Sequence, residues 1–201
     1  MQHFAPVSLI GAPTDIGDAD RAAALGPDAL RVAGLAQALA ARGFDVADRG
    51  NLSGPMNPWQ PPREGYRHLE QVVAWNRAVM EAMGAELAHG RLPILLGGDH
   101  CLAIGSITGI ARHCRKHGRK LRVLWLDAHA DFNTHEVTPS GNIHGMPVAC
   151  VCGLGPAQLT TLGGDAPAVD ASCIRQIGIR SVDPGERRLV HDIGLEILDM
   201  R

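Results

Sequence analysis

The densest group of potential metal ligands in the chain is Asp127-Ala-His129-Ala-Asp131, which directly follows the apolar run Arg-Val-Leu-Trp-Leu. Side chains alternate along a strand, so these three polar residues are expected on the same side of its carboxyl end. Two carboxylates and an imidazole suit Mn²⁺ better than metals that prefer thiolates, with Zn²⁺, Co²⁺ or Fe²⁺ as alternatives. A strand end with solvated polar residues is the competing interpretation, because short motifs also arise by chance.

A histidine follows a second apolar run, Pro-Ile-Leu-Leu, through the turn Gly97-Gly98-Asp99-His100. The two glycines allow the backbone to turn sharply. Open α/β sheets bind their ligands at the carboxyl edge of the strands, so His100 is expected at the same edge as Asp127. Taken alone, such a histidine is more often a core residue or the start of a helix.

A third polar cluster lies in the segment that follows Asp131. Its hydrogen-bonding side chains include Asn133, Thr138, Ser140, Asn142 and His144. An ordinary polar surface loop would have the same composition. Three polar clusters that each lie just past a strand of one sheet are, however, hard to attribute to coincidence, and together they predict a functional site.

The elements that position these clusters alternate between short apolar runs and longer helical patterns, which is typical of βα units and a mostly parallel sheet. Gly, Pro or Asp bounds each apolar run. Strands are predicted over residues 7–10, 44–48, 93–96, 122–126, 174–179 and 195–198, and helices over residues 27–42, 64–89 and about 104–117. The proline-rich residues 51–62 are predicted to form an ordered loop, and Asp183 and Glu186 in isolation predict a helix start.

Length and composition indicate one soluble globular domain over residues 1–201, with 45% hydrophobic and 20% charged residues. Nineteen basic residues against 21 acidic ones disfavour nucleic acid as a partner. The apolar stretch at residues 7–10 is too short for a signal sequence or a membrane span. Five cysteines without zinc spacing or a dense disulfide pattern fit a reducing compartment, so a cytoplasmic location is expected.

Four segments of the chain resemble the ureohydrolases, and arginases in particular. They are Gly97-Gly-Asp-His-Cys-Leu-Ala-Ile-Gly-Ser, Asp127-Ala-His-Ala-Asp-Phe-Asn-Thr, Ser140-Gly-Asn-Ile-His-Gly-Met-Pro-Val and Arg180-Ser-Val-Asp-Pro-Gly-Glu. The last of these is similar to arginase rather than agmatinase. The resemblance covers essentially the whole chain and implies an arginase-like three-layer α/β/α fold with a mostly parallel sheet.

The resemblance also implies a chemistry, namely hydrolysis of L-arginine to L-ornithine and urea on a cluster of two Mn²⁺. By position, His100, Asp127 and Asp131 would bind the first metal, Asp127 would bridge, and His129 would bind the second metal. A hydroxide on the metals would attack the guanidinium carbon, and His144 would transfer a proton.

The substrate-binding residues follow from the same resemblance. Asn133, Thr138 and Ser140 match residues that hold the α-carboxylate, and Asp183 matches the residue that holds the α-amino group. Asn142 and Glu186 lie within the same matching segments and complete the predicted substrate-binding set. The resemblance further implies a homo-oligomer, a trimer or hexamer, when the protein is complete.

The chain departs from the family in length, because arginases continue into a Ser-x-Asp-x-Asp segment that supplies further metal ligands and has no match in this sequence. The first metal therefore lacks one protein ligand and the second lacks two. In the family the missing strands lie in the middle of the sheet, so two central strands of this apparently truncated chain would stay unpaired. The chain alone is accordingly predicted to be inactive.

Two alternatives to an arginase remain open. One is another ureohydrolase that acts on agmatine or formimidoylglutamate, although agmatine lacks the α-carboxylate that the loop from Asn133 to Ser140 would bind. The other is a catalytically silent, truncated module that binds metal or interacts with other subunits. Reading the coding sequence past Arg201 for a Ser-x-Asp-x-Asp segment would discriminate between an arginase and the silent module.

Overall fold

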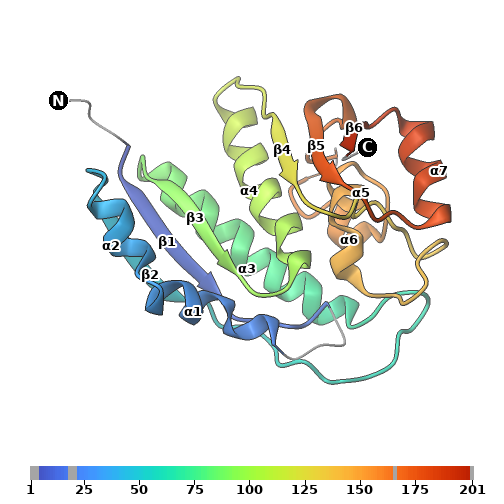
Figure 1. Cartoon of the computed structure of the whole chain (residues 1–201), viewed down its shortest axis with the longest axis horizontal. Helices are drawn as coiled ribbons and strands as arrows, with labels where there is room; N and C mark the ends of the chain where they lie inside the picture. Colours follow the sequence, from blue (N-terminus) through green and yellow to red (C-terminus); the bar gives the residue numbers. More distant parts are fainter. Residues whose placement is uncertain (1–4, 18–21, 165–166, 200–201) are drawn as a thin grey trace.

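Parallel strands and helices alternate along the chain in a computed structural model that describes residues 5–17, 22–164 and 167–199 (Figure 1). The strands are β1 (Val7–Ala12), β2 (Val46–Asn51), β3 (Leu92–Gly97), β4 (Val123–Leu126), β5 (Ile174–Ile179) and β6 (Glu196–Asp199). The helices are α1 (Gly26–Val32), α2 (Leu35–Ala40), α3 (Leu69–Ala88), α4 (Ala103–Lys116), α5 (Pro147–Val151), α6 (Ala157–Thr160) and α7 (Pro184–Ile193). Short 3₁₀ turns are η1 (Ala23–Leu25), η2 (His100–Leu102), η3 (Ile143–Gly145) and η4 (Ala171–Cys173).

The strands form two parallel sheets of three strands each, in the orders β2-β1-β3 and β4-β5-β6. Within the described part of the chain, β3 and β4 therefore pair on one side only. This agrees with the prediction that strands are missing between them. Figure 1 shows β3 and β4 pointing in the same direction, so their carboxyl ends lie toward one edge of the molecule.

Helices cover both faces of the first sheet. Leu9 and Leu96 are buried in a small core beside α2, whereas Ile10 on the opposite face joins the main core with Val72 and Val79 of α3. The main core continues through α4 and α5 to β4 and β5, so α3 and α4 link the two sheets. No helix among the described residues is both long and apolar enough to cross a membrane.

Two predicted helices differ from the observed ones. The pattern over residues 27–42 forms α1 and α2 rather than one helix, because Gly34 between them has a left-handed backbone with a φ of 83°. The pattern over residues 64–89 becomes helical only at Leu69, since Glu64 and His68 also have positive φ values. Residues 52–62 lie outside helices and strands, as the prolines predict.

All five cysteines are free thiols. Burial raises the pKa of Cys150 to about 12, and burial followed by the charge of Asp170 does the same for Cys152. Both thiols are therefore protonated at neutral pH, which makes them packing groups rather than nucleophiles.

The buried carboxylate of Glu86 on α3 interacts with several residues of the first sheet near its amino-terminal end. Ser8 donates a hydrogen bond of 2.5 Å to Glu86 Oε2, and Arg49 and Arg91 lie 3.0 Å and 3.9 Å from the carboxylate. The pKa of Glu86 is lowered, mainly by the Ser8 hydrogen bond. Burial opposes this shift, and the interaction with Arg49 lowers the pKa further.

Replacing Glu86 with Gln should lower the free energy of unfolding near pH 7 by about 1.5 to 3 kcal/mol, the range for hydrogen bonds to charged groups. Because the folded pKa lies below the unfolded value, the stabilisation is present above the unfolded pKa and is lost as the pH falls through the folded one. Urea denaturation of both proteins from pH 7 to about pH 3 measures this difference. A difference in the free energy of unfolding that stays constant over this pH range would contradict the interpretation that the charge of Glu86 stabilises the fold.

Candidate metal centre and substrate pocket

His100 is held at the carboxyl end of β3 by the turn that precedes it. Gly98 packs so closely that a Cβ there would collide with the carbonyl oxygen of Thr14. Asp99 then caps η2, and its Oδ1 accepts a hydrogen bond of 2.8 Å from the Cys101 amide. The His100 ring stacks on Trp125 of β4, with 4.8 Å between the ring centroids. The turn and this stacking fix the position of the imidazole.

Asp127, His129 and Asp131 lie in a loop beyond β4, which ends at Leu126. Strand alternation therefore does not explain why they lie together, although His129 continues the parallel pairing through a bridge to Ser181. Backbone hydrogen bonds hold the loop instead, because Arg180 and Ser181 both donate to the Ala128 carbonyl. Asp131 itself has a left-handed backbone with a φ of 49°, an uncommon conformation for a residue other than glycine.

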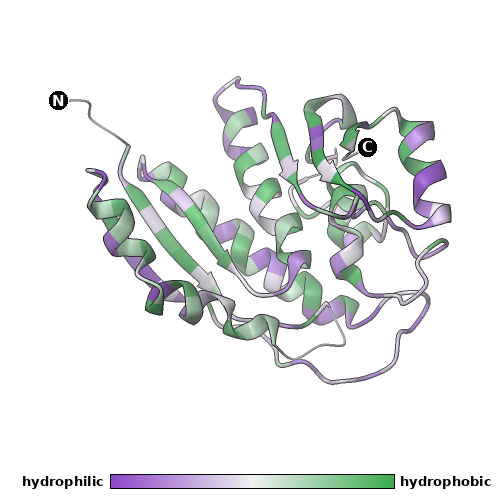
Figure 2. Cartoon of the chain, viewed as in Figure 1, coloured by the Kyte–Doolittle hydropathy of each residue, from purple (hydrophilic) through white to green (hydrophobic). Residues whose placement is uncertain are grey.

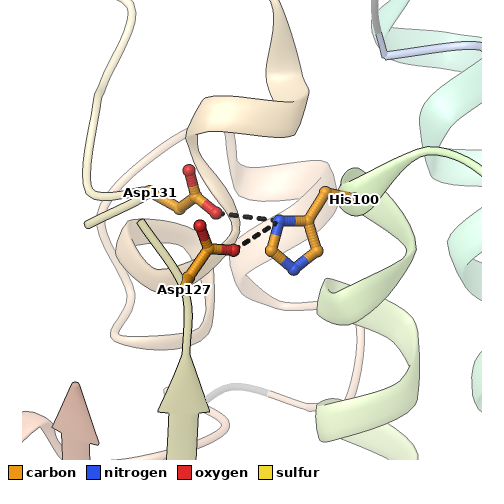
Figure 3. Close-up of side chains that lie close together, drawn as sticks. All are labelled: His100, Asp127 and Asp131. Atoms are coloured by element: carbon orange, nitrogen blue, oxygen red, sulfur yellow. Dashed lines mark ion pairs between the residues drawn. The ribbon is translucent and has the colours of Figure 1, made fainter. Parts of the chain in front are cut away.

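Three of the predicted ligands converge. His100 Nδ1 lies 2.9 Å from Asp131 Oδ2 and 3.4 Å from Asp127 Oδ2 (Figure 3). The three ligand atoms are all within 4.8 Å of one another. Asp131 Oδ2 is buried and has no well-aligned hydrogen-bond donor among the described residues, so its approach to His100 is that of an ion pair. One imidazole nitrogen and two carboxylates in this arrangement can hold a divalent cation.

His129 lies outside this three-residue group but on the other side of Asp127. Its Nδ1 is 3.4 Å from Asp127 Oδ1, and its side chain is 62% exposed. Asp127 thus presents Oδ2 to His100 and Oδ1 to His129. Asp127 Oδ1 also accepts a hydrogen bond of 2.9 Å from the His129 backbone amide, so Asp127 orders the loop as well as facing both imidazoles.

The carboxylates change the protonation of His100. Burial alone would lower the pKa of the imidazole, but contact with Asp131 and the negative charges of Asp131, Asp127 and Asp99 outweigh burial and raise it. The negative charges of the cluster therefore favour a positive charge at this position. A bound cation would occupy the same electrostatic minimum.

A cavity of about 410 Å³ opens beside this cluster. It is lined by every predicted site residue except Asp127, which contacts two of the lining histidines. The lining residues are His100, His129, Asp131, Asn133, Thr138, Pro139, Ser140, Asn142, His144, Gly145, Ser181, Asp183 and Glu186. The structure thus brings the three polar segments of the sequence, and the segment after β5, to one pocket.

The hydroxyl groups of Thr138 and Ser140 accept hydrogen bonds from the loop backbone. Thr138 Oγ1 accepts from the amides of Ser140 at 3.3 Å and Gly141 at 3.0 Å, and Ser140 Oγ accepts from the Asn142 amide at 3.2 Å. Each hydroxyl keeps its own hydrogen to donate. Two hydroxyl donors on one wall of a pocket are suited to an anionic group of a ligand.

Asp183 and Glu186 form a capping box at the start of α7, as their spacing predicts. Glu186 is buried, and its two oxygens accept from the amides of Phe132 at 2.7 Å and Asp183 at 3.1 Å. Burial is the main cause that raises the pKa of Glu186, against the two backbone hydrogen bonds. Glu186 therefore joins α7 to the loop that carries Asp131.

Asn133 provides a second connection between the loop and the start of α7. Its Nδ2 donates a hydrogen bond of 3.1 Å to Asp183 Oδ2, and its buried Oδ1 has no partner among the residues that the structure describes. An unpaired buried acceptor is costly, so a ligand that donates a hydrogen bond there would be favoured.

His144 lies in η3, with a partly exposed side chain that lines the pocket. Its Nδ1 is 4.0 Å from Asp99 Oδ2. Asp99 is a site residue that sequence reasoning missed, although it is the neighbour of His100, and so is Ser181, which lines the pocket. No sequence pattern shows that the Trp125 ring supports His100.

The fold and the site define an α/β protein with a candidate metal centre at the carboxyl edge of its sheets. A family model described as the arginase family matches residues 5–201. The chain therefore belongs to the arginase family, and the proposed resemblance is confirmed.

Individual relatives support this assignment. The chain is 39% identical to the arginase of Brevibacillus brevis over 194 residues, which are 96% of this chain and 64% of the relative. It is 43% identical to the arginase of Brucella melitensis, with 96% and 63% covered. The native structure of the Bacillus caldovelox arginase superposes with a TM-score of 0.89 at 37% identity, covering 98% of this chain and 65% of that one, which confirms the arginase-like α/β fold.

The chain spans less than two thirds of the length of these relatives and corresponds to their N-terminal portion.

Proposed function

We propose that this chain supplies the substrate pocket and part of the metal centre of an arginase, which hydrolyses L-arginine to L-ornithine and urea. The observation that carries the proposal is the single pocket that joins the His100, Asp127 and Asp131 cluster to Asp183 and the Thr138 and Ser140 hydroxyls. In this proposal the metal-binding cluster matches the guanidinium end of the substrate, and Asp183 and the two hydroxyls match its amino acid end.

The donor set of the cluster fits Mn²⁺, because carboxylate oxygens and imidazole nitrogens are ligands that this ion accepts. We propose that His100, Asp127 and Asp131 hold a first Mn²⁺ and that Asp127 and His129 contribute to a second. Bound manganese would supply the Lewis acidity that activates water near neutral pH. The orientation of Asp127 between the two histidines supports its proposed bridging role.

The remaining residues bind and orient the substrate in this proposal. Thr138 and Ser140 donate their hydroxyl hydrogens to the α-carboxylate, and Asn133 donates the second hydrogen of its amide. Asp183 accepts from the α-amino group, for which it retains acceptor capacity beside its bonds to Asn133 and to the α7 backbone. Glu186 and Asn142 hold these groups in place, since Glu186 bonds the backbone and Asn142 Oδ1 accepts from Arg67 Nε at 2.8 Å.

Hydrolysis adds water to the guanidinium carbon and breaks its bond to Nε of arginine, which becomes the δ-amino nitrogen of ornithine. The amine that leaves needs a proton, and His144 is the titratable group of the pocket that we assign to its transfer. Binding the amino acid end at Asp183 and the hydroxyl wall fixes the distance of the guanidinium from the metal cluster, which is the positioning on which the rate depends.

L-Arginine should be processed in preference to agmatine, which lacks the α-carboxylate. The hydrogen bonds from the two hydroxyls alone, at about 1.5 kcal/mol each, correspond to a preference of about 10² in kcat/KM. The test uses a chimera, the completed enzyme, in which this chain continues into the remaining third of the Brucella melitensis arginase.

The Thr138→Val and Ser140→Ala variants of the completed enzyme provide the matched comparison. Each should lower kcat/KM for L-arginine while leaving that for agmatine nearly unchanged. Equal turnover of the two substrates by the unmodified completed enzyme would refute the substrate assignment.

A further inference from the structure

A polar segment before α3 packs against the loop that carries the proposed substrate-binding hydroxyls. The segment is residues 60–68, which we call the brace, and the loop is residues 133–142, which we call the recognition loop. Figure 1 shows the connection from β2 to α3 running beside the loop that follows β4, and Figure 2 shows that this connection is largely hydrophilic there. The contacts between the two segments are accordingly hydrogen bonds and close backbone packing.

A tight turn at the tip of the brace sets its fit to the recognition loop. Arg63 and Tyr66 exchange two backbone hydrogen bonds of 2.9 Å. The two residues between them, Glu64 and Gly65, both have positive φ values, which is the geometry of a type I′ turn. A Cβ at Gly65 would lie only 2.8 Å from His135 Cβ, so the turn rests directly on the recognition loop.

Arg67 of the brace connects this turn to the far end of the recognition loop. Its backbone amide donates a hydrogen bond of 2.8 Å to the Gly141 carbonyl, and its Nε donates one of 2.8 Å to Asn142 Oδ1. Its Nη1 donates a third, also of 2.8 Å, to the Gln60 carbonyl within the brace. The guanidinium group therefore holds the side chain of Asn142 against the brace.

Asn142 links Arg67 to one of the two hydroxyls that face the pocket. The Asn142 amide donates a hydrogen bond of 3.2 Å to Ser140 Oγ, and both residues line the pocket. Arg67 does not line the pocket, so it acts on a ligand only through the recognition loop and through its charge. The position of the Ser140 hydroxyl thus depends on a side chain that no ligand in the pocket touches.

The positive charge of Arg67 has no acidic partner in the described part of the chain. Both hydrogen bonds of its side chain end on amide oxygens, those of Asn142 and Gln60, and no carboxylate there lies within ion-pair distance. A cation that is not neutralised attracts an anionic ligand group. The charge behind Asn142 and the hydroxyls in front of it therefore favour the same part of a ligand.

We propose that Arg67 is a positioning residue that sets the selectivity of this pocket for a substrate with an α-carboxylate. The inference rests on the proposed function, because it takes the Thr138 and Ser140 hydroxyls as the carboxylate site. The contacts of Arg67 include the recognition loop but not the metal-binding cluster. Its loss should therefore weaken binding of the amino acid end of the substrate and leave the metal centre intact.

Arg67→Ala in the completed enzyme tests this role through the ratio of two substrates. Its kcat/KM for L-arginine should fall about tenfold, mainly through a higher KM, because a charge-assisted hydrogen bond that supports the hydroxyl wall is lost. Its kcat/KM for agmatine, which lacks the carboxylate, should change by less than about threefold, and its Mn²⁺ content should not change. A merely structural role would lower both values together.

Two further arginine variants separate the side chain from the segment that carries it. Arg63→Ala is the matched control, because Arg63 is exposed in the same turn and its side chain has no hydrogen bond or ion pair among the described residues. It should keep kcat/KM for both substrates within about threefold. Arg67→Lys keeps the charge but lacks the fork that reaches two oxygens, so it should recover only part of the loss.

Binding of L-ornithine, which has the same amino acid end, gives the comparison without turnover. Titration calorimetry should show about tenfold weaker binding to the Arg67→Ala protein than to the unmodified completed enzyme. Binding of putrescine, the analogue without the carboxylate, should change by less than about threefold.

A double-mutant cycle tests whether Arg67 acts through the Ser140 hydroxyl. In a Ser140→Ala background, Arg67→Ala should lower kcat/KM for L-arginine by less than about threefold, because the group that Arg67 positions is already gone. Strict additivity of the two substitutions, or an equal fall for agmatine, would overturn the positioning role. Equal turnover of L-arginine and agmatine by the unmodified completed enzyme would count against the proposed function instead, so the two failures are distinguishable.

Discussion

The 201-residue chain alone should bind at most about one Mn²⁺ after dialysis and should release no urea above background. Its described residues assemble one three-ligand group, His100, Asp127 and Asp131, with His129 beside it. A metal site is tight when its ligands are complete and supported, so a first site with three ligands fills weakly and a second with two hardly fills. Hydrolysis by a metal pair needs both ions about 3.5 to 4 Å apart, so one weakly held ion cannot supply it.

Elemental analysis and titration calorimetry measure the Mn²⁺ content and affinity of the isolated chain, and a urea assay measures its activity. The variant Asp131→Asn should abolish the remaining Mn²⁺ binding, because Asp131 provides the buried carboxylate of the group. Asp192→Asn is the matched control, since Asp192 is an exposed acid on α7 whose neighbour His191 is its ion-pair partner. Two tightly held Mn²⁺ per chain, or robust urea release, would show that other residues replace the missing ligands.

The sequence predicts the strands well because each one is a short apolar run with a clear boundary. Five of the six predicted strands coincide with observed ones to within about two residues at each end, whereas the second is predicted over residues 44–48 and observed at Val46–Asn51. Its observed residues are largely polar and exposed, so hydrophobicity does not mark where the strand ends. The strand depends on pairing with β1, which a local pattern cannot show.

The helices are less predictable where the backbone conformation of a single residue, rather than the hydrophobic pattern, determines where a helix ends. The pattern of leucines is compatible with one continuous helix that contains Gly34. The left-handed backbone of Gly34 nevertheless separates α1 from α2. Short helices such as α5 and α6 have too few residues for a helical period to be recognised in the sequence.

The candidate site is predictable in its residues but not in its geometry. Polar residues after apolar runs indicate His100 and Asp131, yet strand alternation gives the wrong reason for their convergence. The left-handed backbone of Asp131, the hydrogen bond from the Phe132 amide to Glu186 and the stacking of Trp125 on His100 hold the groups together. The last two contacts join residues far apart in the chain, so local sequence patterns do not specify them.

His144 should matter for turnover and not for metal binding. It lines the pocket but lies outside the three-residue group that could hold a metal ion. Its Nδ1 faces Asp99, at 4.0 Å from Oδ2, whereas Asp127 and Asp131 face His100. Replacing His144 with Ala in the completed enzyme should therefore leave the Mn²⁺ content unchanged and lower kcat by about 10² to 10⁴, the usual contribution of a positioned acid or base.

His135→Ala provides the matched control for this change, because His135 is an exposed histidine of the same loop that packs beside Tyr66 and does not line the pocket. It should keep kcat within about threefold of the unmodified completed enzyme, as expected for a surface position. The pH dependence separates a proton-transfer role from a structural one, since loss of an acid or base removes one limb of the kcat profile, whereas a loosened loop lowers kcat at every pH. Loss of Mn²⁺ from the His144→Ala protein would instead make His144 a ligand, and an unaltered pH profile would remove it from the proton-transfer step.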